Sequence, residues 1–228
     1  MFFGGKAAGR ALVPTSGEHD GEWFKPGFDD SGWTAGKNGA GYEREEGYEP
    51  LISDSFDFEE QMYGKATSLY LRFPFEIDDL EKIKSAASLL LRMKCDDGFV
   101  AYINGVEVAR RNVEGTPPSF NTLAGTNHES TGQFEAIALL DVDSLEEGEN
   151  ILAIQMQNTT HSSSDLHLRI EVVANPENGG QCPVGMACSQ DGITGEIMLN
   201  WINREGGYEA IQVWRNGEMI EEDIGGDQ

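Results

Sequence analysis

The stretch that decides the fold is Asp96-Asp97-Gly98-Phe99-Val100-Ala101-Tyr102-Ile103-Asn104-Gly105-Val106-Glu107-Val108-Ala109-Arg110. Apolar residues recur at every second position on both sides of Asn104-Gly105, and this period of two is typical of β-strands. Asn-Gly between two such runs predicts a two-residue hairpin, because both central residues of a type I′ turn need a positive φ. The stretch therefore predicts two antiparallel strands joined by a tight turn.

Similar runs occur along most of the chain, at residues 69–77, 89–95, 134–140, 151–157 and 166–172. Residues 79–85 form a short helix or, alternatively, a loop with Leu80 and Ile83 turned inward. Short strands separated by turns indicate a sandwich or jelly roll and argue against alternating strands and helices around a parallel sheet. We therefore expect an all-β fold.

The alternation stops where turn-forming residues cluster, in Asn175-Pro176-Glu177-Asn178-Gly179-Gly180. We place a first domain at 1–175, a linker at 176–182 and a second, truncated β-domain at 183–228. The second part has three predicted strands, which are too few to close a sandwich. Its open strand edges favour self-association or a protein partner.

The charge of the chain bears on its partners. Its 228 residues include 40 acidic and 16 basic side chains, which gives a formal net charge of −24. This charge argues against binding to nucleic acid and to anionic membrane surfaces, which both require Lys and Arg. No apolar run has the length of a membrane-spanning helix, so we expect no membrane insertion. The charge is compatible with Ca²⁺, with neutral glycans or simply with solubility.

Four motifs in order carry a family resemblance: Phe28-Asp29-Asp30-Ser31-Gly32-Trp33, the stretch 96–110, Gly148-Glu149-Asn150-Ile151-Leu152-Ala153-Ile154 and Ser163-Ser164-Asp165-Leu166. Together they resemble the galactose-binding-domain-like jelly rolls of large secreted and cell-surface bacterial proteins, over roughly residues 7–174. The tail resembles the first strands of a fibronectin-type-III-like repeat. The resemblance implies an extracellular or cell-surface accessory module that binds a glycan or serves as a spacer, although the fold alone does not decide between these functions.

Two polar loops, after Arg110 and after Gln157, are the candidate glycan site, because long loops at one end of a sandwich commonly carry binding. Alternatively, both loops are simply solvated and bind no ligand. Tyr102 is expected to offer its ring to a sugar, unless the N-terminal loops cover it. The candidate ligand-binding residues are Tyr102, Arg110, Arg111, Asn127, His128, Asn158, His161 and Asp165.

Asp29, Asp30 and Asp97 are candidate ligands of a structural Ca²⁺ ion, because this ion takes six to eight oxygens from carboxylates and turn carbonyls. Both segments also have a structural interpretation. Residues 29–33 form an Asx turn with Trp33 packed between the sheets, and residues 96–98 form a tight turn with an aspartate paired to Arg110.

The cysteines and the remaining polar motifs give no sign of catalysis. Cys95 is expected to be a buried thiol, whereas Cys182 and Cys188 either form a small disulfide loop or stay free. Ser162-Ser163-Ser164 lacks the context of a nucleophile elbow. The acidic segment 43–60 contains no distinct carboxylate pair for glycoside hydrolysis. His167 is expected on the surface.

We therefore predict a non-catalytic, carbohydrate-binding accessory module. The alternative is a structural spacer or assembly module that acts through protein–protein contacts and has no glycan ligand.

Overall fold

The computed structural model describes residues 4–45, 47–84, 88–130, 133–139, 142–175, 186–190, 197–201, 212–215 and 218–222. Its strands are β1 (Ala8–Leu12), β2 (Thr34–Lys37), β3 (Ala40–Glu43), β4 (Ser68–Ile77), β5 (Ser88–Cys95), β6 (Gly98–Ile103), β7 (Val106–Arg111), β8 (Glu135–Leu139), β9 (Gly148–Gln157), β10 (Asp165–Asn175), β11 (Met186–Gln190), β12 (Ile197–Trp201), β13 (Gln212–Arg215) and β14 (Glu218–Glu222). Its helical elements are the α-helices α1 (Glu59–Met62) and α2 (Leu80–Lys84) and the 3₁₀ turns η1 (Gly17–His19), η2 (Glu49–Leu51), η3 (Asp54–Phe56) and η4 (Val142–Ser144). Strands dominate, so the prediction of an all-β chain is confirmed.

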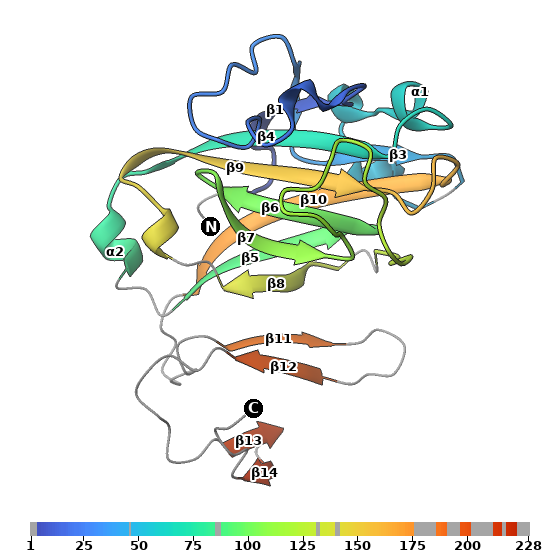
Figure 1. Cartoon of the computed structure of the whole chain (residues 1–228). Coiled ribbons are helices and arrows are strands. Elements are labelled where there is room, and N and C mark those ends of the chain that lie inside the picture. Colours follow the sequence, from blue (N-terminus) through green and yellow to red (C-terminus); the bar gives the residue numbers. More distant parts are fainter. Residues whose placement is uncertain are drawn as a thin grey trace.

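Two antiparallel sheets pack face to face and form a β-sandwich (Figure 1). The strand order is β2-β1-β4-β9-β6-β7 in the larger sheet and β3-β10-β5-β8 in the smaller one. The core between them takes Leu71 and Phe73 from β4 and Leu91 and Met93 from β5, all of them buried. Burial of these rows of apolar side chains is the main force that holds the two sheets together.

The predicted hairpin at Asn104-Gly105 is confirmed. Strands β6 and β7 pair with Ile103 opposite Val106. Asn104 has a φ of 49° and Gly105 a φ of 87°, as a type I′ turn requires. The short helix predicted at 79–85 is also present, as α2, and Ile83 is buried.

The outer face of the larger sheet is covered by the N-terminal loops, which lie over β1 and β4 in Figure 1. Trp23, Phe24 and Trp33 pack there against Tyr70 and Tyr102. The ring of Trp23 stacks on Tyr70 with 4.2 Å between the centroids. This layer buries the second face of β4 over residues 68–73, whereas Pro74 and Glu76 remain exposed. Trp33 belongs to the same layer and does not lie between the sheets.

The C-terminal part contains two further strand pairs, β11 with β12 and β13 with β14. The predicted linker 176–182, Cys182 and the side chain of Cys188 lie outside the described residues, so the domain boundary and the disulfide stay predictions. Cys95 is a buried free thiol, as expected. No helix in the described part of the chain is both long and apolar enough to cross a membrane.

Candidate metal centre

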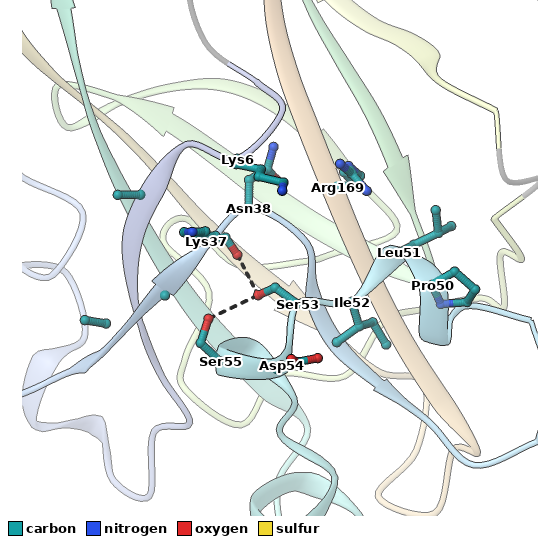
Figure 2. Close-up of a pocket in the computed structure, with 13 residues that line it drawn as sticks. Lys6, Lys37, Asn38, Pro50, Leu51, Ile52, Ser53, Asp54, Ser55 and Arg169 are labelled. Carbon is teal, nitrogen blue, oxygen red and sulfur yellow. Dashed lines mark hydrogen bonds between the residues drawn. The ribbon is translucent and has the colours of Figure 1, made fainter.

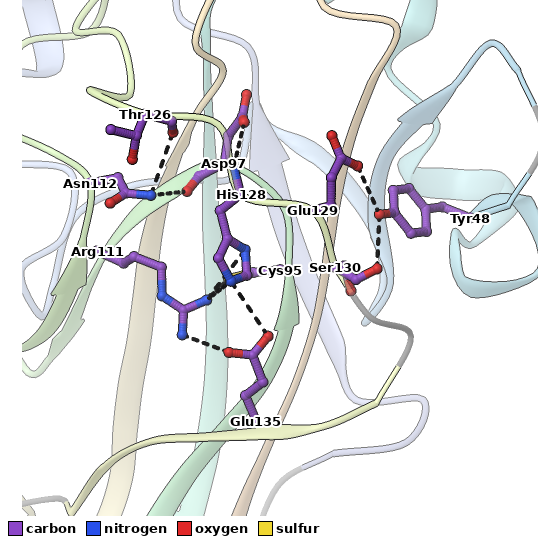
Figure 3. Close-up of polar contacts among 10 residues, drawn as sticks. All are labelled: Tyr48, Cys95, Asp97, Arg111, Asn112, Thr126, His128, Glu129, Ser130 and Glu135. Atoms are coloured by element: carbon purple, nitrogen blue, oxygen red, sulfur yellow. Dashed lines mark hydrogen bonds and ion pairs between the residues drawn. The ribbon is translucent and has the colours of Figure 1, made fainter. Parts of the chain in front are cut away.

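Asp97 holds the two predicted binding loops together at the end of β5. Its side chain is fully buried, and its Oδ1 accepts a hydrogen bond from the His128 N–H at 3.3 Å. Its Oδ2 accepts hydrogen bonds from the N–H of Thr159 at 2.8 Å and from its hydroxyl at 3.1 Å. The loops after Arg110 and Gln157 therefore meet at Asp97, which occupies a φ of 53°. Figure 3 shows the Asn112 amide donating to the backbone carbonyl of Asp97 and the His128 N–H donating to its carboxylate.

Three other carboxylates converge where these loops meet. Asp96 follows the last residue of β5, Glu129 lies in the loop after β7, and Asp165 begins β10. One oxygen of each lies within 4.8 Å of the other two. Asp96 is 1% exposed, and its buried Oδ1 has no hydrogen-bond partner among the described residues. Asp165 is half-buried and Glu129 is exposed, so the cluster opens toward solvent.

The electrostatics of this cluster disfavour three ionised carboxylates in the absence of a cation. Burial, followed by the charges of Asp165, Asp97 and Glu129, raises the pKa of Asp96 to about 8. Burial, followed by the charges of Glu129 and Glu43, raises the pKa of Asp165 to about 6. Without a cation, Asp96 therefore retains a proton at neutral pH.

A divalent cation fits this donor set. All three side chains offer oxygen, the ligand that Ca²⁺ prefers, at roughly 2.3–2.6 Å from the ion. Two oxygens on opposite sides of one such ion are separated by about 5 Å, so carboxylates within 4.8 Å of one another are within its reach. A bound ion would give Oδ1 of Asp96 a partner, which this oxygen lacks among the described residues.

The structure does not bring the predicted metal ligands Asp29, Asp30 and Asp97 together in one cluster. Asp29 is exposed and accepts a hydrogen bond from the Ser31 N–H at 3.0 Å. This bond forms the Asx turn that was the structural interpretation of residues 29–33. Asp30 forms an ion pair with the buried Arg72, with 2.7 Å between Oδ2 and Nε. Asp97 is adjacent in sequence to the carboxylate that does join the cluster, but N–H and O–H donors occupy its own oxygens.

Several predicted glycan contacts have structural partners. Tyr102 is 3% exposed and stacks on Phe24 with 4.1 Å between the ring centroids. The N-terminal loops therefore cover its ring, which was the alternative to a sugar contact. Arg110 pairs with Glu107, at 2.6 Å between Nη2 and Oε2, and makes no ion pair with an aspartate in the described part of the chain.

Two further predicted contacts lie close together in Figure 3. Arg111 contacts Nε2 of His128 at 2.9 Å and pairs with Glu135 at 2.8 Å. Asn158 is buried and donates to the Tyr42 hydroxyl at 2.8 Å. These contacts join the two loops to the neighbouring strands β3 and β8.

Asn127 and His161 remain exposed, and the structure adds an aromatic residue whose chain segment contacts that of His161. Tyr63 is 37% exposed, and the next residue, Gly64, donates its N–H to the His161 carbonyl at 2.7 Å. The guanidinium carbon of Arg44 lies 3.7 Å from the centre of the Tyr63 ring. No pattern in the sequence points to Tyr63, because this residue follows a short helix outside the alternating strands.

His167 corrects a second expectation from the sequence. It is fully buried, and the Tyr48 ring stacks on it with 5.0 Å between the centroids. The Tyr48 hydroxyl in turn donates to the Ser130 carbonyl at 3.0 Å (Figure 3). Burial, with a smaller effect of Lys94 and Arg169, lowers the pKa of His167 to about 4. The segment 43–60 thus covers part of β10, and the prediction of a surface histidine was wrong.

No protein-family model matches the chain, and no curated protein matches it either. Three solved structures illustrate the similarities that exist. Bacteroides uniformis beta-glucuronidase 2, bound covalently to cyclophellitol-6-carboxylate aziridine, is 14% identical with a TM-score of 0.44, over 82% of this chain and 20% of that one. A glycosyl hydrolase family 2 member from Bacteroides cellulosilyticus is 18% identical with a TM-score of 0.41, over 74% of this chain and 20% of that one. Ruminococcus gnavus beta-glucuronidase is 12% identical with a TM-score of 0.41, over 96% of this chain and 36% of that one.

The chain thus spans about a fifth of the length of the first two structures. Similarities at this level do not bear on its activity, and the functional argument rests on the site itself.

Proposed function

We propose that this chain is a non-catalytic accessory module of a larger secreted or cell-surface protein, and that its two loops bind a glycan. In this proposal a Ca²⁺ ion held by Asp96, Glu129 and Asp165 fixes the loops in place. One observation carries it: three carboxylates lie within 4.8 Å of one another, and the innermost has a buried, unpartnered oxygen. A cation at this position ties the loop after β7 to the end of β5 and to the start of β10, which directly follows the second loop.

The burial of Asp96 separates this role from catalysis. A carboxyl group with a raised pKa is suited to act as a general acid, but it must touch the atom that it protonates. Asp96 is 1% exposed. This burial argues against contact with a glycosidic oxygen and is compatible with the coordination of a bare ion next to the exposed Glu129.

The exposed side chains around the two loops suit a sugar. Asn127 and His161 offer an amide and an imidazole for hydroxyl groups, and Tyr63 offers a partly exposed ring for the C–H face of a pyranose. Polar groups fix the orientation of a ligand while an aromatic ring supplies contact area. In this proposal the glycan lies across Tyr63 and His161, whose chain segments are joined by a backbone hydrogen bond.

A glycan array screened with the intact chain tests the second half of the proposal. We expect binding to at least one class of neutral glycan in the presence of Ca²⁺. The double variant Tyr63→Ala/His161→Ala should weaken binding by about tenfold or more, because a sugar contact of this kind contributes on the order of 1–2 kcal/mol. The matched control is Val106→Ala, which removes an exposed apolar side chain from the β6–β7 hairpin, outside both loops.

EDTA added to the same array tests whether the cation supports the loops. We expect the signal to fall on chelation and to return with added Ca²⁺. Binding to no glycan, with light scattering that shows a stable dimer or larger assembly, would favour the alternative of a spacer that acts through protein–protein contacts.

A further inference from the structure

A second site candidate is a pocket lined by positive charges, shown in Figure 2. Its volume is about 700 Å³. The lining comes from the segment before β1, from β2, from residues 50–55 and from β10. None of the carboxylates or loop residues of the candidate metal centre lines it.

Three cations face this pocket in a chain whose net charge is −24: Lys6, Lys37 and Arg169. Asp54 is the one acidic residue in the lining, and it makes no ion pair with any of the three among the described residues. Lys94 lies opposite Arg169 on the neighbouring strand β5 and adds a further positive charge to that face of the sheet.

Arg169 differs from the other arginines whose side chains the structure describes. Each of the others forms an ion pair with an acidic residue: Arg10, Arg44, Arg72, Arg92, Arg110 and Arg111. Arg169 has no such partner in the described part of the chain, although acids outnumber bases 40 to 16 overall. A half-buried guanidinium without a carboxylate is available to bind an external oxyanion, for which its planar fork is suited.

The remaining walls match a sugar ring better than a bare ion. Pro50, Leu51 and Ile52 supply an apolar side. The Ser53 hydroxyl donates to the Lys37 carbonyl at 2.9 Å. The Ser55 hydroxyl lies 3.3 Å from the Ser53 hydroxyl. Apolar surface beside hydroxyl groups and cations is the combination that a carbohydrate with one acidic substituent requires.

We propose that this pocket binds an acidic saccharide unit through its carboxylate or sulfate group. Lys6, Lys37 and Arg169 would hold the anion, and the segment 50–55 would contact the ring. The net charge of −24 repels an extended polyanion at a distance, which favours a ligand with one or two charges over nucleic acid or a membrane. The proposal goes beyond the loop site and does not require it.

Titration calorimetry on the full chain tests this pocket with three probes: a disaccharide that contains a hexuronic acid, a sulfated disaccharide and an uncharged disaccharide. We expect at least one acidic probe to bind, the uncharged one to bind at least tenfold more weakly, and binding to weaken with added salt. The variant Lys37→Gln/Arg169→Gln should reduce the affinity for the acidic probe by at least tenfold. Its melting temperature should remain near that of the wild type, because neither side chain has an ion-pair partner to lose in the described residues.

The control variant Lys25→Gln removes an exposed positive charge that lies outside this pocket. It should leave the affinity unchanged. The proposal is overturned if neither acidic probe binds at millimolar concentration, if the uncharged probe binds equally well, or if the double variant binds like the wild type. In the presence of EDTA, the wild-type chain should bind the acidic probe with unchanged affinity. A failure of the metal site and a failure of this pocket are therefore distinguishable.

Discussion

Addition of Ca²⁺ at pH 8 is expected to raise the melting temperature of the chain by roughly 5–10 °C. An ion that binds the folded state at a hundred times its Kd stabilises that state by about 2.7 kcal/mol. For a domain of this size, each kcal/mol shifts the melting temperature by roughly 2–4 °C. The ion also removes the repulsion among Asp96, Glu129 and Asp165, which lie within 4.8 Å of one another. Differential scanning fluorimetry in EDTA and in excess Ca²⁺ measures the shift.

Asp96→Asn is the sharpest variant for this experiment. It removes one ligand, the most deeply buried carboxyl group of the cluster, so the shift on adding Ca²⁺ should largely vanish while the ion-free protein stays as stable as the wild type or becomes more stable. Asp29→Asn is the matched control, because it makes the same chemical change at an exposed Asx turn. A full Ca²⁺ shift in Asp96→Asn, or an equal loss in Asp29→Asn, would contradict the assignment.

The pH dependence of the Ca²⁺ effect follows from the same cluster. The pKa of Asp96 is about 8 in the folded chain and roughly 3.9 when unfolded. Between these values the folded state binds more protons than the unfolded state, so this group makes the ion-free protein less stable as pH rises. Ca²⁺ competes with the proton, so the shift in melting temperature should be small at pH 5.5 and largest at pH 8 or above.

Trp23→Ala is expected to destabilise the sandwich by about 3–5 kcal/mol, the usual cost of deleting a buried Trp or Phe side chain. Trp23 is 1% exposed and stacks on Tyr70 at 4.2 Å. Its carbonyl oxygen also accepts a hydrogen bond from the buried Arg72, so a cavity here disturbs the Arg72–Asp30 ion pair. Chemical denaturation measures the loss of unfolding free energy.

Two further variants serve as comparisons for Trp23→Ala. Trp23→Phe keeps an aromatic ring and should cost markedly less. Val106→Ala, at an exposed hairpin residue, should stay within about 0.5 kcal/mol of the wild type. If Trp23→Ala cost less than about 1 kcal/mol, the N-terminal loops would not be an integral layer of the domain.

The period of two in the sequence was sufficient to predict strands β4 to β10 and their inner rows, but not the short strands β2 and β3. Leu71 and Phe73 face the core as their alternation predicts, and Asn104-Gly105 forms its turn. The outer layer over β4 could not be predicted, because the loops that hold Trp23 and Trp33 have no strand or helix period. A pattern within one strand shows which side chains share a face, but not what covers that face.

The site was predicted in part for a similar reason. Polar loop composition located the two loops that meet at Asp97. The carboxylate cluster itself depends on how sheets and loops close in space, because Asp96, Glu129 and Asp165 come from three distant parts of the chain. Asp96 and Asp97 are adjacent and chemically identical in sequence. Only the structure shows that donors occupy both oxygens of Asp97, whereas Asp96 joins the cluster and its Oδ1 has no hydrogen-bond partner among the described residues.

Titration calorimetry of the metal-free chain with Ca²⁺ near pH 7, in two buffers of different ionisation enthalpy, tests the central claim most directly. The account predicts one ion per chain and the release of about one proton, because the ion displaces the proton that the raised pKa of Asp96 retains at this pH. In Asp96→Asn both the binding and the proton release should be lost. An absence of Ca²⁺ binding in the wild type, or binding of equal strength in Asp96→Asn, would contradict the claim that Asp96, Glu129 and Asp165 form a metal centre.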